Sequence, residues 1–347
     1  MAASVRDIAK EAGVSITTVS RALNSHPGIS TKTRDRVLRT ADRVGYSTRA
    51  LKMTGMAIGF AQAGGGRLNS GYDSELVYGI QERLAREVSA DLVMLDLADR
   101  AEGESYTQFC RRKRVRGLIL RTTANDHEEC RLIASEGIPT LVLAARFEPD
   151  DDVSFMVCES SEASRRAVEH LIHLGHRRIA LVLHRQLDTD HADRERGYRE
   201  ALAASNIEID PSLIIRLVPT LGGGANALSQ LLSLPDPPTG VFFTDPRPTI
   251  GAMCRAHEVN LKVPEELSII GFDDSQERKR MYPRITAVCQ PTSEMGAEAA
   301  NWMIGRFAGV SPPRIQKCLS SFLEINHTTG APPPVPVRLM PSGQRIE

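Results

Sequence analysis

A run of short hydroxyl side chains that ends in an arginine lies close to the start of the chain. It reads, in order, Ser15, Ile16, Thr17, Thr18, Val19, Ser20 and Arg21. On a helix, small side chains allow close approach to another molecule, and the outward N–H groups of the first turn attract phosphate. An arginine one turn later can donate two parallel hydrogen bonds to the edge of a guanine. These residue types predict a helix that enters the major groove of DNA; the alternative is a small helical bundle that contacts another protein.

Three short helices are expected to position these side chains. Ser4, Ser15 and Ser30 each precede apolar residues at helical spacing, and serine is a favoured N-cap. Gly13 lies between the first two helices, where a helix commonly ends. Two short helices joined by a brief glycine-containing turn form a helix-turn-helix unit. We therefore expect the second helix, at about 16–23, to pack through its apolar side and to expose its hydroxyl residues and arginine.

The amino-terminal region differs in charge from the rest of the chain. The 347 residues carry 43 Lys or Arg and 43 Asp or Glu, so the formal net charge is zero. Residues 1–46 nevertheless hold eight Lys or Arg against four Asp or Glu. A basic module on a neutral protein is typical of nucleic-acid binding, although a small basic excess also occurs on ordinary solvated surfaces.

The sequence lacks the motifs of common enzymes and metal sites. No GxxxxGK[ST], GxSxG or HExxH pattern occurs, and the six cysteines are scattered without a CxxC pair. His170, His173 and His176 share helical spacing, but packing and capping explain them better than metal binding does. The first residues have no apolar core like that of a signal peptide, and no run of 18 apolar residues occurs. We expect a cytoplasmic protein with no membrane contact, no catalytic residues, no metal and no cofactor.

From residue 57 onward, short apolar runs alternate with amphipathic stretches. The apolar runs include 57–61, 92–95, 117–121, 140–143, 179–183, 213–217, 240–244 and 267–271. This alternation predicts an α/β fold of parallel sheets with helices on both faces. The number of strands is too large for one sheet of this length, so we expect two doubly wound lobes. In such folds a ligand binds at the carboxyl ends of the strands, here in a cleft between the lobes.

The basic module resembles the DNA-binding head of the lactose-repressor (LacI/GalR) family. The resemblance rests on 5–15 (VRDIAKEAGVS), 18–24 (TVSRALN), 29–37 and the pair Gly45-Tyr46. It implies that Ile16, Thr17 and Arg21 read base edges, although Ile16 could instead complete the apolar stripe of its helix. The positions that would hold or support phosphate contacts are Thr18, Ser20, Asn24, Ser30, Thr33 and Tyr46. Phosphate contacts position a protein on DNA, whereas base contacts give it specificity.

The segment 47–56 departs from the family pattern. In the family a Pro-Asn pair opens a hinge helix, which wedges a leucine into the minor groove. Here the segment reads STRALKMTGM, without that pair, and is about five residues shorter than the family spacing. Leu51 is the candidate wedge, and a plain flexible linker is the alternative.

The resemblance continues to about residue 330. It rests on segments such as 169–171 (EHL), 175–179 (GHRRI) and 268–274 (SIIGFDD). It implies a periplasmic-binding-protein-like effector domain in which the chain crosses between the lobes three times. The expected N-lobe comprises 57–157 and 290–319, and the expected C-lobe comprises 158–289 and 320–330.

The resemblance also implies which residues bind the effector. Arg194 matches the arginine that grips the ligand, and Asp273, the first acid of GFDD, matches the residue that accepts hydrogen bonds from ligand hydroxyls. Asp245 aligns where many relatives have asparagine, and Tyr72 aligns with an aromatic that covers the ligand. Arg146 is a further candidate, for which an exposed loop charge is the alternative. An arginine with two acids and an aromatic face resembles a sugar site.

These features predict a ligand-responsive transcription regulator that binds double-stranded operator DNA and represses carbohydrate-use genes. The predicted parts are a head at 1–46, a hinge at 47–56, an effector domain at 57–330 and a disordered tail at 331–347, which holds five prolines. We expect a homodimer, because a single head buries little surface on one half-site. The alternatives are a sugar-binding protein for solute uptake and a sugar-processing enzyme with an appended DNA-binding head.

Overall fold

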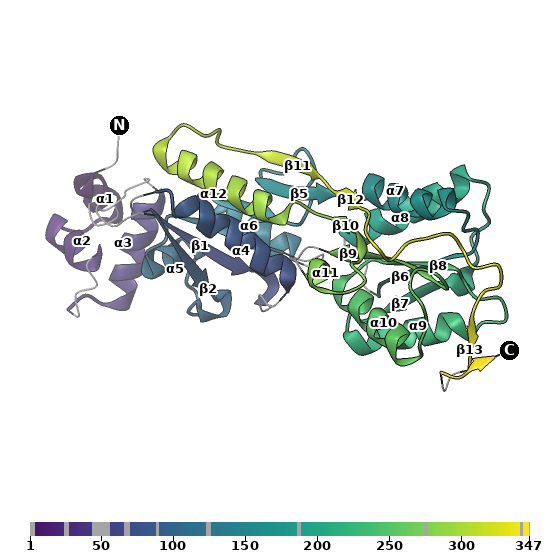
Figure 1. The fold of residues 1–347 in the computed structure, drawn as a ribbon. Helices are drawn as coiled ribbons and strands as arrows, with labels where there is room; N and C mark the ends of the chain where they lie inside the picture. The colour runs from purple at the N-terminus through teal and green to yellow at the C-terminus, as the bar shows by residue number, and fades with distance from the viewer. Residues whose placement is uncertain are drawn as a thin grey trace.

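A computed structural model of the chain shows a small helical head followed by two α/β lobes (Figure 1). It describes residues 4–23, 28–43, 56–65, 70–87, 90–122, 126–185, 189–273, 277–340 and 343–346. The prediction of a helix-turn-helix head followed by two α/β lobes with parallel sheets is confirmed.

Three short helices form the head. They are α1 (Val5–Ala12), α2 (Ile16–Leu23) and α3 (Thr31–Arg43). Ser4 forms a capping box with Asp7 at the start of α1, and Gly13 ends the helix in the left-handed conformation. Ile8, Val19 and Val37, one from each helix, are fully buried against one another. Serine caps and apolar spacing therefore account for the head as the sequence predicted it.

The N-lobe is built on a parallel six-stranded sheet in the order β11-β5-β4-β3-β1-β2. The strands are β1 (Met56–Gln62), β2 (Ala90–Leu95), β3 (Gly117–Arg121), β4 (Thr140–Leu143), β5 (Phe155–Glu159) and β11 (Gln316–Ser320). Its helices are α4 (Gly71–Leu84), α5 (Tyr106–Lys113), α6 (His127–Ser135) and α12 (Thr292–Ala308), with short 3-10 turns at Ala63–Gly65 and Leu97–Asp99. Apolar residues of α5 and α6 pack on one face of the sheet, and those of α4 and α12 pack on the other.

The C-lobe repeats this plan in the order β12-β10-β9-β8-β6-β7. The strands are β6 (Ile179–His184), β7 (Ile214–Leu217), β8 (Gly240–Phe243), β9 (Ser268–Asp273), β10 (Thr286–Cys289) and β12 (Phe322–Glu324). The helices are α7 (Ser161–His173), α8 (Thr189–Ala204), α9 (Leu221–Leu232), α10 (Pro246–Glu258) and α11 (Glu277–Arg280), with a 3-10 turn at Pro211–Leu213. Only β12 runs antiparallel to its neighbour among these strands. Helices α7 and α8 cover one face, and α9 and α10 cover the other.

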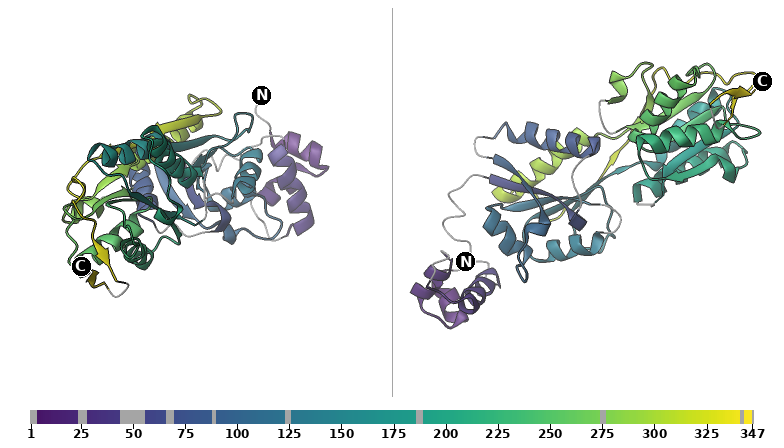
Figure 2. Two further views of the ribbon diagram at one scale, coloured as in Figure 1. Left: turned by 90° about the vertical axis from the view of Figure 1, so that its right-hand side faces the viewer. Right: turned by 90° about the horizontal axis from the view of Figure 1, so that it is seen from below.

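The chain passes between the lobes after β5, after β10 and after β11, as the two views in Figure 2 show. The expected boundary at 157/158 falls inside β5, because this strand stays paired with β11 as far as Glu159. The expected boundary at 319/320 likewise falls inside β11, at its last residue. Among the described residues, no helix combines the length and apolar character needed to cross a membrane.

The tail expected to be disordered is instead packed against the C-lobe. Strands β13 (Arg338–Leu339) and β14 (Arg345–Ile346) pair as a small hairpin. Leu339 is only 2% exposed and joins the core beneath α9 and α10. The Arg345 guanidinium lies 2.7 Å from a carboxylate oxygen of Glu266. The prediction failed because proline content was used as the criterion, whereas one leucine and one ion pair anchor the segment.

Leu339→Ala tests whether this packing contributes to stability. We expect the free energy of unfolding to fall by about 2–3 kcal/mol, because the substitution leaves a cavity under the hairpin. Urea unfolding followed by circular dichroism measures the change. Met340→Ala is the matched control, because the Met340 side chain, next to Leu339 in the chain, is 46% exposed. Equal midpoints for Leu339→Ala and wild type would show that the tail does not pack in solution.

Candidate functional site

Helix α2 exposes the face on which the sequence placed the DNA-reading residues. Its buried side consists of Val19, which is fully buried, and Ala22, which is 1% exposed. Ile16 is 51% exposed, so it does not complete the apolar stripe of the helix. Thr17 and Arg21 are also exposed. The helix therefore presents an apolar contact, a hydroxyl and a guanidinium on its open side, and their roles in base reading remain predictions.

Three of the predicted phosphate-binding residues, Thr18, Ser30 and Thr33, lie at helix starts. The Ser15 hydroxyl accepts a hydrogen bond from the Thr18 N–H at 3.0 Å, and the two hydroxyl oxygens are 2.8 Å apart. At the start of α3, Ser30 Oγ accepts from the Thr33 N–H at 3.2 Å and donates to Thr33 Oγ1. Such starts present N–H groups outward, where a phosphate can bind. Ser20 is exposed on α2. The predictions for Asn24, Tyr46 and Leu51 fall outside the described residues.

Arg194 is held rigidly at the carboxyl edge of the C-lobe sheet. It lies in α8, which begins five residues earlier at Thr189, and it is only 5% exposed. Its guanidinium donates to the carbonyl oxygen of Thr244 at 2.7 Å, and its Cζ lies 3.6 Å from the centre of the Phe272 ring. Stacking and the hydrogen bond fix the plane of the guanidinium.

Asp245 stands beside Arg194, directly after β8. Its carboxylate oxygens lie 3.2 and 3.3 Å from His191 Nε2. Burial raises the pKa of the Asp245 carboxyl, but the hydrogen bond with His191 and the positive charge of Arg194 outweigh it, so the pKa lies below its ordinary value. The site thus pairs an ionised acceptor with a fixed donor. The His184 and His191 rings, 5.2 Å apart, extend this cluster.

Asp273 is the last residue of β9, and its backbone lies at this same edge. Strand β8 pairs with β6 and with β9 in parallel, so the three strands end side by side. The structure describes the backbone of Asp273 but not its side chain. It therefore brings Arg194 and Asp245 into one cluster and places the Asp273 backbone at the same edge of the sheet.

Two candidates belong to the N-lobe. Tyr72, in the first turn of α4, is 7% exposed, and the Arg121 guanidinium lies 4.8 Å from its ring centre. Arg121 also approaches an Asp73 carboxylate oxygen at 3.3 Å.

Arg146 is exposed, and its guanidinium reaches across the gap between the lobes to an Asp193 carboxylate oxygen at 3.7 Å. Arg146 is therefore placed as an interlobe contact.

Asp193 is a further charged residue at the cleft, one that the sequence patterns did not indicate. This side chain is 2% exposed in α8 and also approaches Arg196 at 2.7 Å. It directly precedes Arg194, so one helix presents a cation for the cleft and an anion for the opposite lobe. The acids interspersed with basic residues in the segment 190–196 were the available signal.

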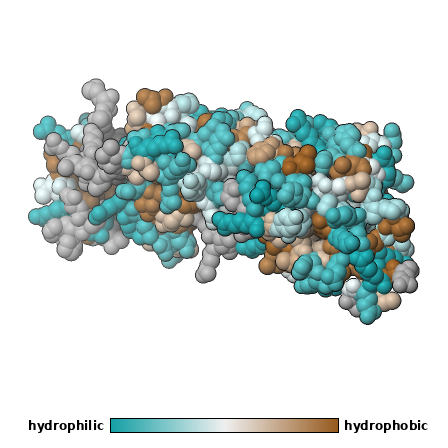
Figure 3. Space-filling model, in the orientation of Figure 1, coloured by the Kyte–Doolittle hydropathy of each residue, from teal (hydrophilic) through white to brown (hydrophobic). Residues whose placement is uncertain are grey.

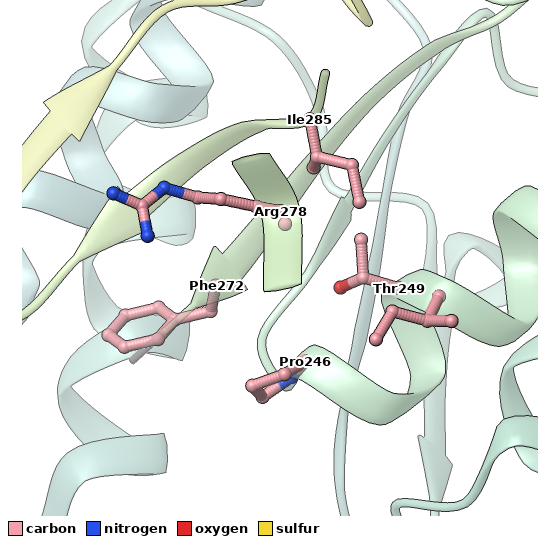
Figure 4. A pocket seen from close by; sticks show the side chains of 7 residues that line it. Pro246, Thr249, Phe272, Arg278 and Ile285 are labelled. Carbon is pink, nitrogen blue, oxygen red and sulfur yellow. The ribbon is translucent and has the colours of Figure 1, made fainter. Parts of the chain in front are cut away.

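A small opening adjoins the Arg194 cluster and was also missed. It is a shallow recess open to solvent and is lined by Pro246, Thr249, Ile250, Gly271, Phe272, Arg278 and Ile285. Figure 4 shows Arg278 and Phe272 on one side of it and Thr249 and Ile285 on the other. The Arg278 guanidinium donates to Glu324 at 2.8 Å. Phe272 belongs to both places, so the opening continues the apolar floor of the predicted effector site. Within the described part of the chain, no group of three His, Cys, Asp or Glu is arranged to hold a metal ion.

Comparisons with known proteins agree with this arrangement. Residues 4–49 match bacterial regulatory proteins of the lacI family, and residues 168–322 match a periplasmic binding protein-like domain. The HTH-type transcriptional regulator DegA of Bacillus subtilis is 32% identical over 304 residues, which cover 86% of this chain and 89% of the relative. The HTH-type transcriptional repressor CytR of Escherichia coli is 29% identical over 317 residues, which cover 89% and 91%.

A solved structure covers nearly the whole chain. The transcriptional regulator CelR–cellobiose complex has a TM-score of 0.64 and 26% identity, and the match covers 94% of this chain and 99% of that one. These relatives favour the regulator over the alternatives of a solute-binding protein or a sugar-processing enzyme. The chain belongs to the LacI family of bacterial regulatory proteins, which are DNA-binding regulators of transcription.

Proposed function

We propose that this regulator is a homodimeric repressor of carbohydrate-use genes whose operator affinity is set by a sugar in the interlobe cleft. The observation that carries the proposal is the cluster at the strand ends in which His191 lies between the fixed Arg194 guanidinium and the Asp245 carboxylate. A sugar hydroxyl both donates and accepts, so it can bond to both groups at once. The Phe272 ring adds an apolar surface for sugar CH groups. The structure of a relative with bound cellobiose supports the same ligand class.

The proposed DNA contacts divide into two kinds. Ile16, Thr17 and Arg21 read base edges in the major groove, and the hydroxyl residues at the starts of α2 and α3 hold phosphates. Arg21 supplies the strongest discrimination, because its guanidinium can bond to two acceptors of a guanine.

Dimerisation completes the proposal. Large apolar side chains are exposed on both lobes, with Tyr78 58% and Met94 52% exposed on the N-lobe and Leu221 53% exposed on the C-lobe. On the face drawn in Figure 3, hydrophobic residues are likewise exposed over both lobes. A second copy would cover such side chains and would give two heads for the two halves of a palindrome.

Arg21→Ala tests base reading. On an operator selected from random duplexes, we expect a loss of about 1–3 kcal/mol, together with relaxed preference at one base pair of each half-site. Fluorescence anisotropy with single-base operator variants measures both effects. Arg6→Ala, an exposed arginine on α1, should leave base preference unchanged. Unaltered preference in Arg21→Ala would remove Arg21 from the reading surface.

Arg194→Ala tests the effector site. We expect operator binding without sugar to match wild type, whereas the sugar that shifts wild-type melting most should no longer change it. Isothermal titration calorimetry and operator anisotropy measure the two responses. Arg199→Ala is the control, because this arginine lies one turn further along α8 and pairs with Glu195 away from the cluster. A wild-type sugar response in Arg194→Ala would show that the ligand binds elsewhere.

Arg146→Ala tests the contact between the lobes. Arg146 is 40% exposed at the side chain, so its ion pair with Asp193 should contribute up to about 1 kcal/mol, equivalent to about fivefold weaker sugar binding. We expect the sugar-bound form to sample open lobes more often, which small-angle X-ray scattering detects as a larger radius of gyration. Arg131→Ala breaks a pair with Asp151 inside the N-lobe and should change neither quantity. Identical scattering and affinity in Arg146→Ala would contradict this role.

A further inference from the structure

A second concentration of positive charge lies outside the head, at the end of α5. Residues 111–116 read Arg-Arg-Lys-Arg-Val-Arg, so five of the six are basic. They form the last turn of α5 and the connection to β3. We call this segment the basic edge. It lies at the end of the N-lobe where β1 begins (Figure 1).

The basic edge adjoins the point at which the linker from the head enters the N-lobe. The Arg116 N–H donates to the carbonyl oxygen of Ala57 at 2.9 Å, and Ile58 is paired with Gly117. Helix α3 ends at Arg43 and β1 starts at Met56. Chain geometry limits the span between these two residues to roughly 45 Å. DNA held by the head is therefore kept within reach of the basic edge.

Ion pairs within the lobe neutralise only part of this charge. Arg112 pairs with Glu104 at 2.7 Å, and Lys113 pairs with Asp99 at 2.7 Å. Arg114 is exposed and has no carboxylate partner among the described residues. Arg116 lies over the Phe307 ring, 4.6 Å from its centre. The other acids nearby are Asp91, exposed opposite Ala57, and Glu136, which is bonded to Thr107. Arg111 is half-buried and interacts with other groups of the lobe, so Arg114 is the charge of the basic edge that projects openly into solvent.

Arg114 ends α5 as its C-cap, and its side chain takes no part in the core. Its φ is 61°, in the left-handed region where glycine or asparagine costs less than a long side chain. The side chain points into solvent. The Arg114 guanidinium is therefore exposed where an external partner can reach it.

We propose that the basic edge binds backbone phosphates of the same DNA duplex that the head reads, which makes the N-lobe a second, sequence-independent contact. Duplex DNA carries one negative charge per about 1.7 Å of axis, so a surface held this close meets several phosphates. The linker, shorter than the family spacing, limits how far the lobe can withdraw. This inference rests on the DNA-binding function proposed above.

The test compares the salt dependence of DNA binding by the full chain and by Arg114→Asn/Arg116→Gln. Asparagine tolerates the left-handed conformation, and Arg114→Asn alone serves as a second variant because it alters only an exposed side chain. Anisotropy with the selected operator and with a random duplex is measured from about 50 to 200 mM KCl. We expect the slope of log affinity against log salt to fall in magnitude by about 1 for each phosphate that the variant no longer neutralises, equally for both duplexes.

Two controls define the outcome. Arg166→Gln/Lys262→Gln removes two exposed charges from the C-lobe and should leave the slope at the wild-type value. Thermal melting and sugar binding should match wild type in Arg114→Asn and in the C-lobe control, whereas Arg116→Gln also removes a contact with the Phe307 ring. A wild-type slope in both basic-edge variants, or a reduced slope on the operator alone, would overturn the inference. A wild-type chain that selects no duplex would overturn the proposed function as well, so the two failures are distinguishable.

Discussion

The two-lobed arrangement depends on strand pairing next to the places where the chain crosses between the lobes. There β5 pairs with β11, and β10 pairs with β12. Glu159, at the end of β5, lies opposite Ser320 of β11, and Cys289 of β10 lies opposite Phe322 of β12. Gln290 Nε2 donates to Ser160 Oγ at 3.3 Å, which links two of the passages directly. The three connections are therefore neighbours in space. Any movement of one lobe against the other must therefore bend the three connections together.

Each lobe holds an arginine against an aromatic ring at the carboxyl ends of its strands. Arg194 lies over Phe272 in the C-lobe, and Arg121 lies over Tyr72 in the N-lobe. A guanidinium fixed in this way loses little conformational freedom when it binds a ligand. Arg146 and Asp193 contribute a contact that exists only while the lobes are close. A ligand that bonds to the Arg194 cluster and bridges to the N-lobe would favour the closed arrangement.

Positive charge is distributed so that both ends of the linker are basic. The head carries its excess on α2 and α3, and the N-lobe carries the basic edge beside Ala57. The attraction between a basic residue and a phosphate weakens with distance and with salt. Basic residues near the linker therefore attract DNA held by the head more strongly than basic residues on the C-lobe do.

The sequence by itself determined the elements whose causes are local. Serine caps and a glycine stop set the limits of the head helices, and the apolar runs marked most strands of both sheets, because capping and periodicity involve residues a few positions apart. Family resemblance then indicated Arg194 and Asp245, which the structure places together. Only the tertiary structure decided that Arg146 meets Asp193, that Arg278 meets Glu324 and that Leu339 is buried. Those contacts join residues about 40 or more positions apart, and their formation depends on strand order and on how the lobes pack, which no local pattern encodes.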